Sequence, residues 1–262
     1  MDRTPCGMMG VSASVALGET RAAETQARPT PFPLVELRQY RTYPGKRDTL
    51  VALFEREFVE SQEALGMQVL GTFRQPSQPD RFVWLRGFAD MSARAKGLNA
   101  FYSGPVWREH SRAANATMED SDDVLLLREA RPGSGFAGED GARPAPDAAA
   151  SPGGLVVAVI DYPEDEAAYA TAFAHQTRPR LAAAGTPVIA EFVREKAANN
   201  FPRLPIRADE DVFVWFAKFN DQASYRRVQG RLREILRTQG AGLAKASDVL
   251  VLAPTARSQL RG

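Results

Sequence analysis

The segment Asp80–Asp90 reads DRFVWLRGFAD, and Asp211–Asp221, 131 residues further along the chain, reads DVFVWFAKFND. Asp, Val, Trp, Phe and Asp stand at identical steps in the two segments. In each segment the apolar residues predict a strand, and the closing aspartate is typical of a helix N-cap. A chain that repeats a strand with its following cap is predicted to contain two copies of one fold.

The match extends in the same order on both sides of this segment. Phe54–Phe73 aligns with Phe173–Phe192 at an offset of 119, and Asp123–Leu127 aligns with Asp248–Leu252 at an offset of 125. The offset changes only between predicted elements, where insertions are tolerated. The duplication therefore covers the whole folded part of the chain.

Both copies show the same predicted order of elements, which is strand, helix, strand, strand, helix, strand. This order is the ferredoxin-like pattern. The first copy has predicted strands near 34–41, 67–74, 81–88 and 124–129, with helices over 46–65, from 90 through 98, and over 105–115; the second has strands near 155–162, 187–195, 211–219 and 248–252, with helices near 164–184 and 221–238. We expect a disordered tail (1–33), a first domain (34–130), a flexible linker (131–153) and a second domain (154–255).

A four-stranded sheet with both helices on one face leaves its other face bare, and that face must be covered. We expect the aromatic residues of the repeated strands to lie on the bare faces: Phe82, Trp84 and Phe88 in one copy, and Phe213, Trp215 and Phe219 in the other. The predicted fold class is α+β, with two tandem ferredoxin-like units packed sheet to sheet as an α/β barrel of the dimeric type within one chain.

Composition excludes several classes of function. The 262 residues carry a formal net charge of +1, which leaves no electrostatic footprint for nucleic acid, and no apolar run is long enough to span a membrane. The single cysteine, Cys6, fits a reducing compartment, and we expect a cytoplasmic protein. With two histidines in the chain we expect no metal site and no cofactor, although a haem would need only one axial histidine such as His110.

The segment Gly133–Gly138 has the G-x-G-x-x-G spacing of dinucleotide-binding loops. That motif requires a helix to begin at its third glycine, because the helix N-terminus holds the pyrophosphate. Here Gly141, Pro144 and Pro146 follow instead. We therefore interpret the segment as linker.

Polar residues of the first copy form the predicted ligand site: Arg38, Tyr40, Arg86, Trp107 and His110. If the polar face of the first strand and the aromatic face of the Trp strand both point into the barrel, the charges must be paired. One interpretation is a structural network between Glu36 and the arginines, with His110 packed against the sheet. The other is an anion or enolate held by Arg38 or Arg86, with His110 as a weak candidate acid or base.

The second copy lacks these polar residues. By the offset of 119, Glu36, Arg38 and Tyr40 align with Leu155, Val157 and Val159, and Ala217 takes the position of Arg86. Any polar site is therefore expected in the first copy.

Five segments of the chain resemble the NIPSNAP family. They are Val35–Tyr40 (VELRQY), Ser103–His110 (SGPVWREH), Ala114–Met118 (ANATM), Asp120–Leu127 (DSDDVLLL) and Asn200–Arg207 (NFPRLPIR). The resemblance covers about 34–130 and 154–255. It implies ferredoxin-like domains that pair as α/β barrels, and it implies no agreed catalytic activity.

Two classes of function follow. The first is a non-catalytic scaffold that binds a small organic ligand or a protein partner, and the absence of metal, nucleotide and nucleophile motifs favours it. The second is a cofactor-independent monooxygenase or isomerase acting on a small aromatic or polyketide-like substrate, which rests on fold analogy. Assembly of several copies is left open.

Overall fold

The computed structural model describes Met1 and residues 30–138, 143–146, 154–239 and 243–262, so most of the expected tail and part of the expected linker lie outside the described residues. The first half contains β1 (Leu34–Thr42), α1 (Arg47–Leu53), η1 (Phe54–Phe58), α2 (Val59–Glu63), β2 (Gln68–Gln75), β3 (Gln78–Phe88), α3 (Met91–Ser103), α4 (Pro105–Asn115), β4 (Met118–Asp120) and β5 (Val124–Glu129). The second half contains β6 (Leu155–Pro163), α5 (Glu166–Ala172), η2 (Phe173–Thr177), α6 (Arg178–Ala183), β7 (Val188–Arg194), β8 (Phe213–Phe219), α7 (Gln222–Gln239) and β9 (Ala244–Pro254).

Eight strands form a closed barrel. Their order is β3-β2-β9-β6-β8-β7-β5-β1, and the pairing of β1 with β3 closes the ring; the short β4 extends β1 outside it. The halves are joined at two places, where β2 pairs with β9 and β5 pairs with β7. Closure leaves none of these eight strands with an unpaired edge.

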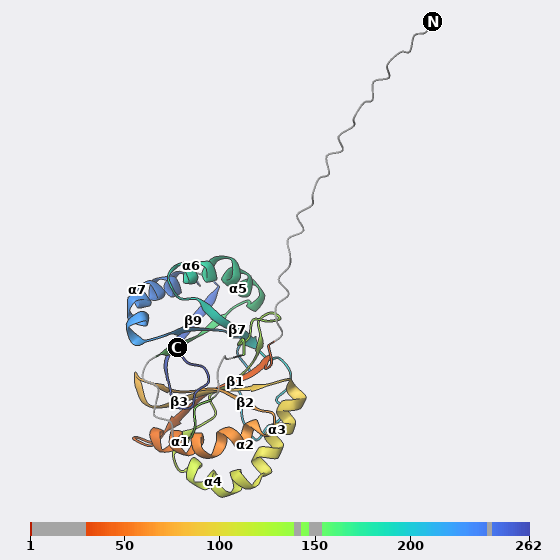
Figure 1. Ribbon diagram of the computed structural model, residues 1–262, viewed down its shortest axis with the longest axis vertical. Coiled ribbons are helices and arrows are strands. Elements are labelled where there is room, and N and C mark those ends of the chain that lie inside the picture. Colours follow the sequence, from red (N-terminus) through yellow and green to blue (C-terminus); the bar gives the residue numbers. More distant parts are fainter. Residues whose placement is uncertain (2–29, 139–142, 147–153, 240–242) are drawn as a thin grey trace.

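Strand order is the same in the two halves. It is β5-β1-β3-β2 in the first and β9-β6-β8-β7 in the second. The helices lie outside the barrel, with α1 to α4 at one end of the molecule and α5 to α7 at the other (Figure 1). The fold is thus a mixed α/β structure with the barrel between two helical layers.

Repeated local features explain why each half folds alike. The side chains of Asp90 and Asp221 accept hydrogen bonds from backbone N–H groups three residues on, at 2.7 and 2.6 Å, which begins the helix after each Trp strand. Gly66 and Gly185 have φ angles of +80° and +77° beyond the first helix of each half, a conformation that favours glycine. The π-helical turns η1 and η2 lie at the same offset of 119.

The orientation expected for the repeated strands is wrong. Val83, Leu85, Val214 and Phe216 point into the barrel, with apolar residues of the other strands such as Leu37, Phe73 and Phe192. The aromatic face points outward, beneath the helices: Phe82, Trp84 and Phe88 in the first half, and Phe213, Trp215 and Phe219 in the second. Both faces of these strands are apolar, so a period of two does not identify the face that lies inside.

The expected alignment between β1 and β6, the first strands of the two halves, is also wrong, by two residues. Arg38 lies opposite Trp84 across β1 and β3, whereas Val159 lies opposite Trp215 across β6 and β8. Because the two tryptophans correspond, Arg38 corresponds to Val159. By the same register Glu36 corresponds to Val157 and Tyr40 to Asp161, so one of these three positions is also polar and buried in the second half. The two additional residues lie between β1 and α1.

The start of the expected linker packs against the barrel. Phe136 is buried in the barrel interior and contacts the rings of Phe192 and Phe216 at centroid distances of 5.3 and 4.9 Å. The backbone N–H groups of Gly133 and Gly135 donate to the carboxylate of Glu129. These N–H groups, which a phosphate would need, are therefore already used.

Cutting the chain between its halves should leave them associated, because two strand ladders and one shared core join them. We expect a protein with a protease site inserted within 147–153 to elute, after cleavage, at the position of the intact 28.7-kDa chain. The uncut variant is the control for the insertion. Two separate folded halves on the sizing column would contradict the shared barrel.

Candidate functional site

One buried carboxylate in the first half binds three arginines. Glu36 Oε2 accepts hydrogen bonds from Arg38 Nη1 at 2.9 Å and from Arg86 Nη2 at 2.6 Å, and Glu36 Oε1 accepts from Arg94 Nε at 2.8 Å. Each of the four side chains is at most 1% exposed. Strands β1 and β3 supply Glu36, Arg38 and Arg86, and helix α3 supplies Arg94. We call this group the Glu36 cluster.

The Glu36 cluster holds more positive than negative charge. Three guanidinium groups face one carboxylate, and no other carboxylate forms an ion pair with them in the part of the chain that the structure describes. Burial disfavours the ionised carboxylate, yet Arg86, Arg38 and Arg94 together hold the pKa of Glu36 well below its usual range. Burial also lowers the pKa of Arg94, although Glu36 partly opposes that shift.

A segment of the second half covers the cluster. Arg94 Nη1 donates to the side-chain oxygens of Asn199 and Asn200, at 3.1 and 2.7 Å, and both residues lie between β7 and β8. Phe201, next in the chain, is buried in the first-half core and stacks on Tyr102 with a centroid distance of 5.6 Å. The site therefore draws residues from both halves.

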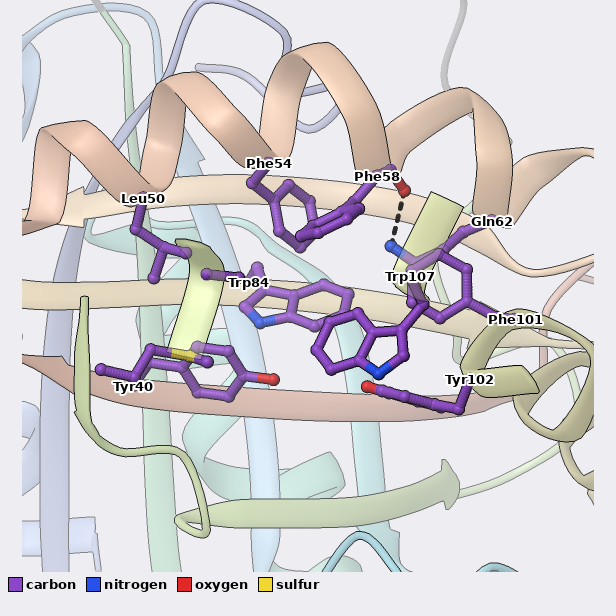
Figure 2. A pocket seen from close by; sticks show the side chains of 11 residues that line it. Tyr40, Leu50, Phe54, Phe58, Gln62, Trp84, Phe101, Tyr102 and Trp107 are labelled. Carbon is purple, nitrogen blue, oxygen red and sulfur yellow. Dashed lines mark hydrogen bonds between the residues drawn. The ribbon is translucent and has the colours of Figure 1, made fainter. Parts of the chain in front are cut away.

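A pocket lies between the sheet and the helices of the first half (Figure 2). It encloses about 350 Å³ of empty space, counting its open mouth, and only a small part of this is wide enough for a water molecule. Its lining is mostly aromatic and aliphatic: Tyr40, Leu50, Phe54, Phe58, Gln62, Trp84, Phe101, Tyr102, Trp107, Ala114 and Met118.

Three of the lining residues, Tyr40, Gln62 and Trp84, carry polar groups. The hydroxyl oxygen of Tyr40 accepts a hydrogen bond from Arg38 Nε at 2.8 Å, and burial raises the pKa of Tyr40, which keeps the phenol neutral. Gln62 accepts from Arg86 Nη1 and donates to the carbonyl of Phe58. The indole N–H of Trp84 is buried and has no hydrogen-bond partner among the described residues. In Figure 2 the hydroxyl groups of Tyr40 and Tyr102 point toward each other.

The structure separates the five residues predicted for the site. Tyr40 and Trp107 line the pocket, while Arg38 and Arg86 lie in the Glu36 cluster directly behind it. His110 is not among the lining residues, and 22% of its side chain is exposed. Its Nε2 atom lies 3.4 Å from Glu57 Oε2, and its ring lies 6.4 Å from that of Phe58, which lines the pocket.

Sequence reasoning missed Arg94, Gln62, Tyr102, Asn199 and Asn200. Arg94 is separated by four residues from the buried Leu98 and so shares its helical face, which was a detectable indication of burial. Asn200 begins one of the segments that resemble the NIPSNAP family, but its contact with Arg94, like that of Asn199, joins residues more than 100 positions apart and has no local signal.

The second half shows what this fold does without the cluster. Val157, Val159 and Ala217 replace Glu36, Arg38 and Arg86 and pack in an apolar core. Trp215, the counterpart of Trp84, donates its indole N–H to the buried carboxylate of Asp161 at 3.2 Å. The partner of the indole N–H is thus present in one half and missing in the other.

The described part of the chain has neither a metal-binding cluster nor a membrane-spanning helix. No group of three or more histidine, cysteine, aspartate or glutamate side chains is arranged to hold a metal ion there. No helix in the described ranges is long and apolar enough to cross a membrane.

The comparisons with known proteins define first the class of fold. A candidate monooxygenase from Lactobacillus acidophilus shares 12% identity, with a TM-score of 0.53 over 87% of this chain and 97% of its own. One from Fusobacterium nucleatum shares 9% identity, with a TM-score of 0.57 over 86% and 93%. At these identities the likeness shows the fold alone. No curated protein matches the sequence.

The sequence of the first half matches a family model. Residues 35–129 match the model of the NIPSNAP family. A NIPSNAP domain protein from Burkholderia xenovorans, for example, shares 21% identity over 36% of this chain and 90% of its own, with a TM-score of 0.33.

Replacing Glu36 with glutamine should destabilise the protein strongly, because three buried guanidinium groups lose their counter-charge. We expect a loss of about 3–5 kcal/mol in urea denaturation at neutral pH. The control is Glu57→Gln, which removes a partly exposed carboxylate next to His110 and Arg56 and should cost at most about 1 kcal/mol.

The destabilisation caused by Glu36→Gln should become smaller as the pH falls. Since the pKa of Glu36 is lower in the folded than in the unfolded protein, its contribution is complete above the unfolded-state value of about 4.3 and declines as the pH falls below it. The difference between Glu36→Gln and the parent protein should therefore shrink in acid. Equal effects of the two substitutions at neutral pH would contradict the role of Glu36.

Proposed function

We propose that this protein binds a small organic molecule in the pocket of its first half, as a non-catalytic binding protein. The observation that carries the proposal is an apolar pocket whose wall includes the hydroxyl of Tyr40 and the unpaired N–H of Trp84. Mostly apolar lining with a few polar groups is the usual composition of ligand sites. A ring-bearing molecule suits the aromatic walls.

Entry of such a ligand requires movement at the pocket mouth. Little of the space is wide enough for a water molecule, whereas Tyr102, Trp107 and Met118 are only half-buried. Tyr102 and Trp107 contact each other at a centroid distance of 4.7 Å. Rotation of these side chains would widen the pocket without disturbing the barrel.

The proposal includes the architecture and its setting. The chain is proposed to be two tandem ferredoxin-like units, over 34–130 and 154–255, and their common strand order supports this. The single cysteine supports a cytoplasmic location.

A second candidate function is cofactor-independent oxidation or isomerisation of an aromatic substrate in the same pocket. The candidate monooxygenases with this fold favour it. Dioxygen consumption on addition of a bound compound, abolished by Tyr40→Phe with binding retained, would replace the first candidate with the second.

Filling the pocket should abolish binding without unfolding the protein. Ala114 is 1% exposed and lines the pocket, whereas Ala113 is exposed on the same helix. We expect Ala114→Leu to weaken binding of naphthalene and toluene at least ~10-fold, at a cost of about 1–3 kcal/mol in stability. Ala113→Leu is the matched control and should bind like the parent.

The three tryptophans make binding visible by NMR. Naphthalene should shift the indole N–H resonances of Trp84 and Trp107, while that of Trp215, in the other half, stays in place. If neither probe shifts these resonances, or if Ala114→Leu binds like the parent, the proposed pocket is wrong.

A further inference from the structure

We infer that the first-half pocket selects a ring-bearing ligand with an acidic oxygen, a phenol-type or carboxylic acid, and binds it as the anion. This inference rests on the proposed function and names the chemical class of its ligand. Three independent features of the site support it: the surplus charge of the Glu36 cluster, the hydrogen bonding of Tyr40, and the comparison with the second half.

The first feature is charge. All three buried guanidinium groups share the single negative charge of Glu36, so among the described residues the cluster behind the pocket carries two positive charges in excess. Arg94 Nη2 is also buried without a hydrogen-bond acceptor. Buried charge is normally paired, because water no longer solvates it. A nearby anion would offset this surplus.

The second feature is the link from the cluster to the pocket. Arg38 Nε donates to the hydroxyl oxygen of Tyr40, so the proton of that hydroxyl points elsewhere and is available to a ligand. The Arg38 guanidinium lies 5.3 Å from the Tyr40 ring centroid and 5.5 Å from that of Trp84. A positive charge this close strengthens a hydrogen bond from Tyr40 to an oxyanion.

The third feature is the internal comparison. In the second half the tryptophan indole N–H donates to a buried carboxylate, Asp161. In the first half Tyr40 takes the position of Asp161, and the N–H of Trp84 has no such partner in the described chain. Figure 2 shows the nitrogen-bearing edge of Trp84 turned toward Tyr40. The oxygen of an anionic ligand would supply the acceptor that the second half carries in its own sequence.

The test compares two probes of nearly equal shape, 4-nitrophenol and 4-nitrotoluene. Only the first has an acidic oxygen, and its anion has a visible absorption band of its own. We expect the parent protein to bind 4-nitrophenol ~10-fold more tightly than 4-nitrotoluene at a pH well above the pKa of the free phenol, where the phenol is fully ionised. The bound phenol should ionise about one pH unit lower than the free phenol, since tenfold preference for the anion corresponds to one unit.

Two variants locate the effect. Tyr40→Phe should retain binding of 4-nitrotoluene and lose most of the preference for the anion. Ala114→Leu should exclude both probes, and Ala113→Leu should change neither result. Near-UV circular dichroism of Tyr40→Phe, matched to the parent, ensures that a lost preference is not lost structure.

The outcomes separate this inference from the proposed function. Equal affinity for the two probes, with both excluded by Ala114→Leu, would overturn the anion selectivity and leave the pocket standing. An anion preference unchanged in Tyr40→Phe would overturn the assignment to Tyr40 and Arg38. Binding that Ala114→Leu does not affect, or no binding of either probe, would overturn the pocket and the selectivity together.

Discussion

The hydrogen bonds from three arginines to Glu36 connect every layer of the first half. Glu36 and Arg38 lie on β1, Arg86 on β3 and Arg94 on α3, so the carboxylate joins two strands to the helices above them. Through Arg94 the same network reaches Asn199 and Asn200, which belong to the second half. Through Arg38 it reaches Tyr40 and the pocket. One ionised side chain, Glu36, thus helps to position two features of the site. They are the segment with Asn199 and Asn200 that covers the cluster, and the hydroxyl group of Tyr40 in the pocket.

The two halves show how one fold carries different chemistry. Their strand order, helix caps and π-helical turns agree, and their barrel-facing residues are apolar in both. They differ on the face beneath the helices, where the first half has the Glu36 cluster and the second has Val157, Val159 and Ala217. Because that face is separated from the barrel interior by the sheet, its polarity changed without any change in strand pairing. This is the physical reason that the scaffold was easier to predict than the site.

Sequence patterns predicted the elements well and their orientation poorly. Strand β3 and the caps at Asp90 and Asp221 followed from local alternation and from one residue type. Local alternation did not predict which face of β3 lies toward the barrel interior, because Val83 and Leu85 are as apolar as Phe82 and Trp84. The two-residue shift between β1 and β6 was hidden, because Tyr43-Pro44 matches Tyr162-Pro163 in sequence although the strands pair in another register. Arg38, Tyr40, Arg86, Trp107 and His110 were predicted from their residue types, and the first four lie in or next to the pocket while His110 does not line it. The contacts of Arg94 and Asn199 join residues distant in sequence.

Comparison with the second half also indicates whether the fold needs the Glu36 cluster for its stability. It forms the same sheet with aliphatic residues at the positions of Glu36, Arg38 and Arg86, so the fold itself does not need buried charge there. Well-packed apolar residues are often as stabilising as a buried ion network, or more so. A network with two guanidinium charges in excess is less favourable still, since each is removed from water without a matching carboxylate. Positions at which a protein departs from the requirements of its own fold tend to be functional. By this reasoning the excess positive charge supports the proposal that the first half carries the ligand site.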